Sequence, residues 1–122
     1  MARAHIGHVE FPADDTGRAQ RFYSELFGWE FNEIEGYGGY FMFSTGAIEQ
    51  ASGAVGKRGQ ATGDKLRIYI TCDSIDDVLA QVPELGGSVV TPRTDIPGQG
   101  WYAVILDSEG SEVGLYENLP SD

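Results

Sequence analysis

The stretch that decides the fold is HVEFPADDTGRAQRFYSELFGW, residues 8–29. Apolar and polar residues alternate around its start, and this pattern predicts a strand over residues 4–11. The segment Asp14-Asp15-Thr16 supplies side-chain oxygens that can cap a helix. Apolar residues then recur at helical spacing, at Ala19, Phe22, Tyr23 and Leu26. Gly28 is placed to end that helix, because glycine readily adopts the left-handed backbone of a C-cap.

Further strands are predicted on both sides of a polar, glycine-bearing linker at about residues 57–65. Before the linker, glycine-bearing turns separate three strand-like pieces, at residues 29–34, 39–44 and about 50–56. After it, alternating residues predict strands at 66–72, 88–91, 101–106 and 113–117. Ser74 and Asp77 form a capping box before a second helix, which Pro83 and the pair Gly86-Gly87 should end.

The two halves repeat one pattern. Arg67 follows His8 by 59 residues, and Gly87 follows Gly28 by the same interval. The order strand, helix, strand, strand, strand therefore occurs twice, at about 4–56 and about 66–118. We predict one α+β domain over residues 1–122, built from two such modules. Because each helix covers one face of its strands, the opposite faces are where a ligand should bind.

Composition limits the function. The chain has 122 residues, which fits one globular domain, and its net charge of -11 disfavours nucleic acid and anionic membranes as partners. The same field would attract a cationic ligand. Cys72 is the only cysteine, so no intrachain disulfide forms, and its alternation with helix-facing residues predicts an inert, buried thiol. Residues 1–5 lack the apolar stretch of a signal peptide, and we expect a cytoplasmic protein.

The segment Arg18–Trp29, preceded by HVEFPADD and echoed by DSEGSEVGLYE at residues 107–117, resembles the vicinal oxygen chelate superfamily. That family includes glyoxalases, extradiol dioxygenases, and fosfomycin- and bleomycin-resistance proteins. The resemblance covers about residues 5–118. It implies paired βαβββ modules that form a curved, open sheet around a cleft, and a homodimer in chains this short.

The resemblance also implies a divalent metal, held by one residue on the first and one on the last strand of each module. The first of these positions falls on His8, but the equivalent on the second module falls on Arg67, which cannot coordinate a metal. The expected carboxylate on the last strand falls on Gly114. The first module's last strand offers no carboxylate, although Glu49 lies just before it. We therefore expect no metal cofactor.

A substitute metal site is the alternative. The only two histidines, His5 and His8, are three apart in a strand and point to opposite faces, so they cannot chelate together. Glu10 shares the face of His8, and Glu112 has the same parity as Gly114. A site of His8, Glu10 and Glu112 would then hold the ion.

The predicted ligand site lies on the faces away from the helices. Arg67 there needs a negative partner, either Glu10 or Glu112 or a carboxylate of the substrate. Tyrosines with polar tips suit an apolar pocket that is selective at a few points. The predicted lining is His8, Glu10, Tyr40, Arg67, Tyr69, Tyr102 and Tyr116. Phe22, Phe41 and Phe43 are expected under the helices, whereas Trp29 and Trp101 fit either place.

Three functions stay open at this point. The first is a metal-independent, glyoxalase-like protein that binds a small molecule, including a resistance-type protein that sequesters a cationic compound. The second is a metal-dependent lyase or dioxygenase, in which His8 and substitute carboxylates hold the ion. The third is an interaction module without a ligand. No GxSxG motif and no GxxxxGK[ST] phosphate-binding loop points to another chemistry.

Overall fold

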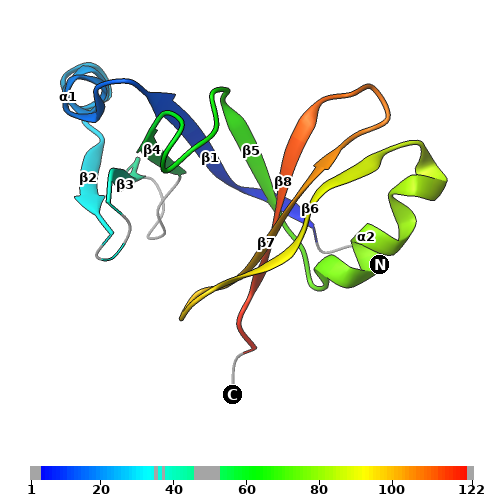
Figure 1. Ribbon diagram of the computed structural model, residues 1–122. Coiled ribbons are helices and arrows are strands. Elements are labelled where there is room, and N and C mark those ends of the chain that lie inside the picture. Colours follow the sequence, from blue (N-terminus) through cyan, green and yellow to red (C-terminus); the bar gives the residue numbers. More distant parts are fainter. Residues whose placement is uncertain (1–3, 35, 37, 46–52, 121–122) are drawn as a thin grey trace. The chain divides into compact units, whose positions relative to one another are not determined.

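The computed structural model describes residues 4–34, 36, 38–45 and 53–120, and its elements are drawn in Figure 1. The chain divides into two compact units. The first unit is residues 8–67, and the second unit is residues 1–7 together with 68–122. Each unit contains the predicted order of strand, helix and three strands, so the α+β fold built from two βαβββ modules is confirmed.

In the part that the structure describes, the first unit has a four-stranded mixed sheet and one helix. Its strands lie in the order β2-β3-β4-β1, in which β1 is parallel to β4 and the other pairs are antiparallel. The helix contacts β2 and β4. The elements are β1 (His5–Ala13), α1 (Thr16–Phe27), β2 (Glu30–Glu33), β3 (Tyr40–Ser44) and β4 (Gly53–Lys57).

The second unit repeats this topology. Its strands lie in the order β6-β7-β8-β5, with β5 parallel to β8 and antiparallel pairs elsewhere. The helix α2 contacts β6, β7 and β8. The elements are β5 (Arg67–Thr71), α2 (Ile75–Gln81), the 3-10 helix η1 (Pro83–Leu85), β6 (Ser88–Ile96), β7 (Gly100–Leu106) and β8 (Glu112–Asn118).

The helix ends follow the predicted capping residues. Asp15 accepts a hydrogen bond from the backbone N–H of Arg18, and Gly28 ends α1 at a φ of 76°. Ser74 accepts from the backbone N–H of Asp77 at 3.2 Å at the start of α2. These side-chain oxygens satisfy backbone donors that have no partner within the helix. Both predicted helix starts are therefore confirmed.

Two predicted boundaries need correction. The strand predicted at 88–91 continues as β6 to Ile96, through Pro92. Its pairing with β7 shifts register twice, and these irregularities allow a proline within a strand at the edge of the sheet. The strand predicted at about 50–56 is β4, which begins at Gly53; residues 50–52, like Glu49, lie outside the described residues.

The core of the second unit lies between α2 and one face of its sheet. Cys72, Ile75, Ala103 and Leu115 form the buried cluster, and Trp101 packs against it. Burial raises the pKa of the Cys72 thiol, as expected for an inert cysteine. Trp101 thus has a packing role on the helix side of the sheet.

The core of the first unit is aromatic. The ring of Trp29 stacks on the rings of Phe43 and Tyr23, with ring centroids 4.5 Å and 5.3 Å apart. Tyr23 also contacts Phe11. Tyr23 therefore takes the inward position on α1. The expectation that Phe22 packs under the helix was wrong, because its side chain lies one position away and is 58% exposed.

Candidate functional site

The polar face of the first unit is opposite its aromatic core. Phe11 in β1 contacts Tyr23 of α1, so its alternating neighbours His8 and Glu10 lie on the other face of the strand. In the sheet register Glu10 is paired with Ala54, which places Glu10 beside β4 as well. This face carries the predicted site residues of the first unit.

Tyr40 joins these two residues through hydrogen bonds. Its hydroxyl lies 2.8 Å from His8 Nε2 and donates to Glu10 Oε2 at 2.8 Å. The guanidinium of Arg67 lies 4.0 Å from Glu10 Oε1. We call His8, Glu10, Tyr40 and Arg67 the Tyr40 network. The structure thus brings four of the seven predicted site residues together.

Proton counting fixes the direction of the network. A tyrosine hydroxyl has one hydrogen, and in this arrangement Tyr40 donates it to the carboxylate of Glu10, which can only accept when ionised. The contact between His8 Nε2 and the Tyr40 oxygen then requires Nε2–H to donate. His8 Nε2 therefore carries a hydrogen, as it does in the neutral Nε2–H tautomer.

Burial supports the same protonation state. Desolvation lowers the pKa of His8 to about 4, so its ring is neutral at physiological pH. Glu10 is only 6% exposed, and an ionised carboxylate at that depth needs compensating donors and a positive charge. Tyr40 and Arg67 supply these. The network is therefore a nearly neutral, hydrogen-bonded unit, one negative charge against one positive.

A glycine allows the ring of Tyr40 to lie across the sheet. Tyr40 is paired with Gly56 of β4, and a Cβ at Gly56 would lie 3.1 Å from Tyr40 Cδ1 and would overlap Thr62 Cγ2. Gly56 is not among the site residues predicted from the sequence. The available signal was a glycine inside a predicted strand, which often marks a close approach of another group.

The three remaining predicted site residues lie on one face of the second unit. Tyr102 and Tyr116 are cross-strand partners, and Tyr116 is also paired with Thr71, two residues from Tyr69. Alternation places this face opposite Ala103 and Leu115 of the core. Burial raises the pKa of Tyr116, whose hydroxyl donates to the carbonyl oxygen of Gln99 at 2.8 Å. That these tyrosines share a ligand with the Tyr40 network stays a prediction.

Gly114 has a steric reason to be glycine. Tyr69 is its parallel partner, and the buried Tyr69 ring lies so close that a Cβ at position 114 would overlap it, with Tyr69 Cγ at 2.9 Å. The place where the resemblance implies a carboxylate is thus filled by an aromatic ring. A side chain at this position would have to displace Tyr69.

The donors present do not match the metal set that the resemblance implies. Position 67 holds a cation, position 114 has no side chain, and His8 Nε2 is bonded to Tyr40. Within the described ranges, no three His, Cys, Asp or Glu side chains are grouped so that they could hold an ion. Glu112 is exposed at the start of β8 in the second unit, and its joint site with His8 and Glu10 stays a prediction.

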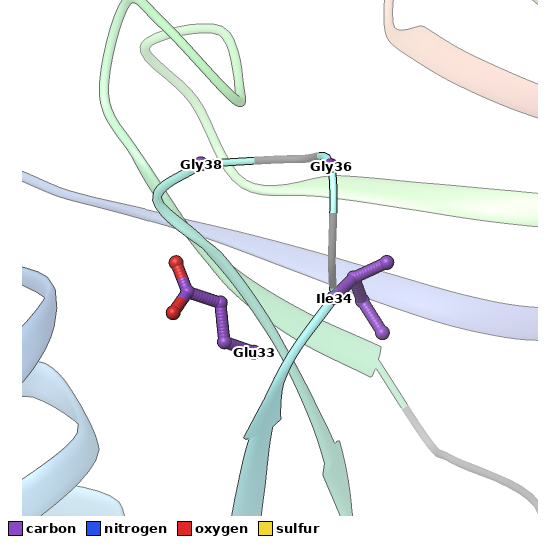
Figure 2. A pocket seen from close by; sticks show the side chains of 4 residues that line it. All are labelled: Glu33, Ile34, Gly36 and Gly38. Atoms are coloured by element: carbon purple, nitrogen blue, oxygen red, sulfur yellow. The ribbon is translucent and has the colours of Figure 1, made fainter.

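Two hollows lie away from the Tyr40 network. One, at the turn after β2, is lined by Glu33, Ile34, Gly36 and Gly38, and Figure 2 shows the side chains of Glu33 and Ile34 pointing away from each other. The other, in the second unit, is lined by His5, Thr71, Cys72, Asp73, Glu117 and Asn118. The first has one polar side chain, and the second contains the inert Cys72. Neither is a better candidate than the Tyr40 network.

The fold and this face define an α+β protein of two βαβββ units, and known proteins resemble it in architecture and in sequence. The description "Bleomycin resistance protein-like N-terminal" applies to the family model that matches residues 5–46. A "Glyoxylase-like domain-containing protein" of Didymella fabae is 30% identical over 117 residues, which are 91% of this chain and 91% of that protein. The chain therefore belongs to the vicinal oxygen chelate superfamily, the glyoxalase and bleomycin-resistance proteins.

Longer relatives match over part of their length. "Putative glyoxylase CFP32" of Mycobacterium bovis is 30% identical over 115 residues, which are 89% of this chain and 44% of that protein. This chain thus spans less than half the length of that relative. The Mn(II)-bound glyoxalase from Novosphingobium aromaticivorans has a similar structure, with a TM-score of 0.70 and 19% identity over 100% of this chain and 43% of that one. At that identity the likeness concerns the fold.

Among the described residues, no helix combines the length and the apolar character needed to cross a membrane.

Proposed function

We propose that this protein is a glyoxalase-like, metal-independent binder of a small molecule, and that the Tyr40 network holds the ligand. The observation that carries the proposal is the Tyr40 hydroxyl between His8 Nε2 and Glu10 Oε2, at 2.8 Å from each. It engages His8 Nε2 in a hydrogen bond. Such a network presents fixed donors and acceptors, which confer selectivity on a small-molecule site.

Three tyrosines form a second candidate surface within the second unit. Tyr69, Tyr102 and Tyr116 share one face and combine apolar rings with polar hydroxyls. Charge supports a cationic ligand, since the net charge of -11 attracts cations over long range while the Tyr40 network itself is nearly neutral. A resistance-type protein that sequesters such a compound, as the matched family's description suggests, is the form of this function that we favour.

Metal content tests the proposal first. Protein purified without added metal is analysed for its elements, and its melting temperature is followed during titration with Mn²⁺. We expect no stoichiometric metal, and the same small response in the wild type and in His8→Ala. Tight stoichiometric binding that is lost in His8→Ala but kept in His5→Ala would overturn the proposal in favour of the metal-dependent lyase or dioxygenase, with Glu10 and Glu112 as the first ligands to test.

A ligand screen tests whether the protein binds a small molecule. Bleomycin and size-matched cationic, neutral and anionic compounds are compared by thermal shift. A ligand that binds only the folded state at a hundredfold excess over its Kd should add about 2.7 kcal/mol of stability. We expect cationic compounds to stabilise the wild type and the control Tyr23→Phe, and to lose this effect in Tyr40→Phe. If no compound moves the melting temperature, the interaction module without a ligand is the better description.

A further inference from the structure

The polar linker that follows β4 folds into a compact turn. Three successive backbone N–H groups, those of residues 60–62, donate to the carbonyl oxygen of Lys57 at 2.9 to 3.2 Å. The backbone N–H of Gly59 donates to the carbonyl oxygen of Thr62 at 3.0 Å. We call residues 58–64 the strap. Because these hydrogen bonds lie within the turn, the strap has a shape that does not depend on the sheet.

The strap lies against two members of the Tyr40 network. A Cβ at Gly56 would overlap Thr62 Cγ2 and would lie 3.1 Å from Tyr40 Cδ1. The methyl group of Thr62 and the ring of Tyr40 therefore lie together over this glycine. At the next residue of the strap, a Cβ at Gly63 would lie 3.5 Å from Arg67 Nη2. The strap thus reaches from the Tyr40 ring to the Arg67 guanidinium.

One side of the strap is toward the solvent and the other is toward the Tyr40 network. Residues 58–60 are exposed, whereas residues 61–63 are half-buried. In the network, the side chain of Arg67 is 17% exposed and that of Glu10 is 8% exposed. These two charged groups therefore have little access to water. A ligand that approaches them past residues 61–63 has to displace the strap.

Bonds to the end of β1 and to Asp14 hold the strap in place. The backbone N–H of Arg58 donates to the carbonyl oxygen of Ala13 at 2.8 Å and fixes the base of the strap. Arg58 Nε also lies 2.7 Å from Asp14 Oδ1, and these side chains are 39% and 72% exposed. An exposed ion pair contributes little stability, so it can open while the sheet stays intact.

We propose that the strap is a lid for the Tyr40 network, which moves away to admit the ligand and returns behind it, with the Asp14–Arg58 pair as its latch. This inference rests on the proposed function, because a lid controls binding only where a ligand binds. Opening breaks the contacts of Thr62 and Gly63 with the network, while the hydrogen bonds within the strap stay intact. A loop that closes over a bound ligand also slows its release.

Chemical access to Arg67 tests the strap without a ligand. The folded protein reacts with phenylglyoxal, which modifies guanidinium groups, and mass spectrometry measures the rates at Arg67 and at Arg93, a reference in the second unit. Asp14→Ala removes the latch and should speed the reaction of Arg67 by up to about fivefold, with no change at Arg93. Glu25→Ala, which breaks an exposed ion pair of 2.8 Å with Arg21, is the matched control and should change neither rate.

A second variant tests the contact between the strap and the site. Thr62→Ser removes the methyl group beside the Tyr40 ring and keeps the hydroxyl, which donates to the carbonyl oxygen of Gly63 at 2.9 Å. We expect Arg67 to react faster by up to about fourfold, because the closed strap loses the burial of one methyl group. Circular dichroism and melting temperature identify any variant that fails to fold.

Binding kinetics with bleomycin connect the strap to the ligand. Bleomycin should associate with Asp14→Ala and dissociate from it faster than with wild type, whereas Glu25→Ala should match wild type. Equal rates of Arg67 modification in wild type, Asp14→Ala and Thr62→Ser would overturn the proposal, as would bleomycin binding with unchanged kinetics in both strap variants. Faster modification of Arg67 in a protein that binds no bleomycin would support the movement of the strap and count against the proposed function.

Discussion

The two units share one topology, but equivalent positions on their first and last strands carry different side chains. Glu10 and Ala54 are parallel partners in the first unit, and Tyr69 and Gly114 are parallel partners at the corresponding place in the second. In the first unit a small side chain lies beside a carboxylate that accepts a hydrogen bond. In the second unit, Gly114 has no side chain, and the aromatic ring of Tyr69 fills the space beside it.

The position two residues earlier on the first strand of each module differs as well. His8 is the neutral member of a hydrogen-bonded network, whereas Arg67 carries a permanent charge and lies beside Glu10. A repeated backbone can therefore carry a polar network in one copy and apolar packing in the other. The side chains at these positions therefore decide the chemistry, which topology alone does not specify.

The largest expected effect concerns His8 and pH. Burial lowers its pKa from 6.5 to about 4, so the unfolded chain binds more protons between these values. His8 therefore costs no stability above pH 6.5, and the free energy of unfolding falls as the pH drops from 6.5 through 4. His8 alone should lower the free energy of unfolding by up to about 3 kcal/mol on acidification. Urea denaturation at several pH values should show a smaller loss for His8→Gln and a wild-type loss for His5→Gln; parallel profiles for His8→Gln and wild type would contradict this.

The next effect concerns Gly114. A methyl group there overlaps the Tyr69 ring, so Gly114→Ala should lower the free energy of unfolding by about 2 to 3 kcal/mol. The reverse change in the first unit, Ala54→Gly, should cost only about 1 kcal/mol. Chemical denaturation of Tyr69→Ala, Gly114→Ala and the double variant measures the coupling. Additive costs would show that the ring is not the obstacle.

A third effect compares two tyrosine hydroxyls. Tyr40→Phe removes the bridge between His8 and buried Glu10 and should cost about 2 kcal/mol, since the carboxylate loses a donor. Tyr116→Phe removes one exposed hydrogen bond to the Gln99 carbonyl and should cost about 0.5 kcal/mol. Thermal and urea unfolding of both variants give the comparison, and equal costs would argue against the network.

The smallest effect concerns the helix caps, where the two units should agree. Asp15→Ala and Ser74→Ala each remove a side-chain acceptor at a helix start and should each cost about 1 kcal/mol. Because the two residues belong to different units, the double variant should show the sum of both costs. A cost that differs from the sum in urea unfolding would show that the two caps do not act independently.

Much of the fold could be predicted from local signals. The caps Asp15 and Ser74 and the terminating Gly28 depend on hydrogen bonds and φ values within a few residues, which the sequence displays directly. The full length of β6 could not be predicted, because Pro92 and two register shifts interrupt its alternation. The outward position of Phe22 depends on which aromatic side of α1 fits the core, and only packing decides that.

The sequence predicted which face of the sheet carries the candidate site, but it did not predict the hydrogen bonds within the site. Strand alternation placed His8 and Glu10 together, since that requires only a period of two. Their bonds to Tyr40 span 32 and 30 residues and depend on the register of β3, β4 and β1, which the sequence does not display. The role of Gly114 needed the same information, because its neighbour Tyr69 is 45 residues away in sequence.

The irregular course of β6 has a consequence for behaviour at high concentration. This strand is the outermost of its sheet, and a long, flat outer strand can recruit strands from other molecules into fibrils. Pro92 removes one backbone donor from that strand, and the two register shifts twist it away from a flat template. The second unit is thereby protected against amyloid-like stacking along this side.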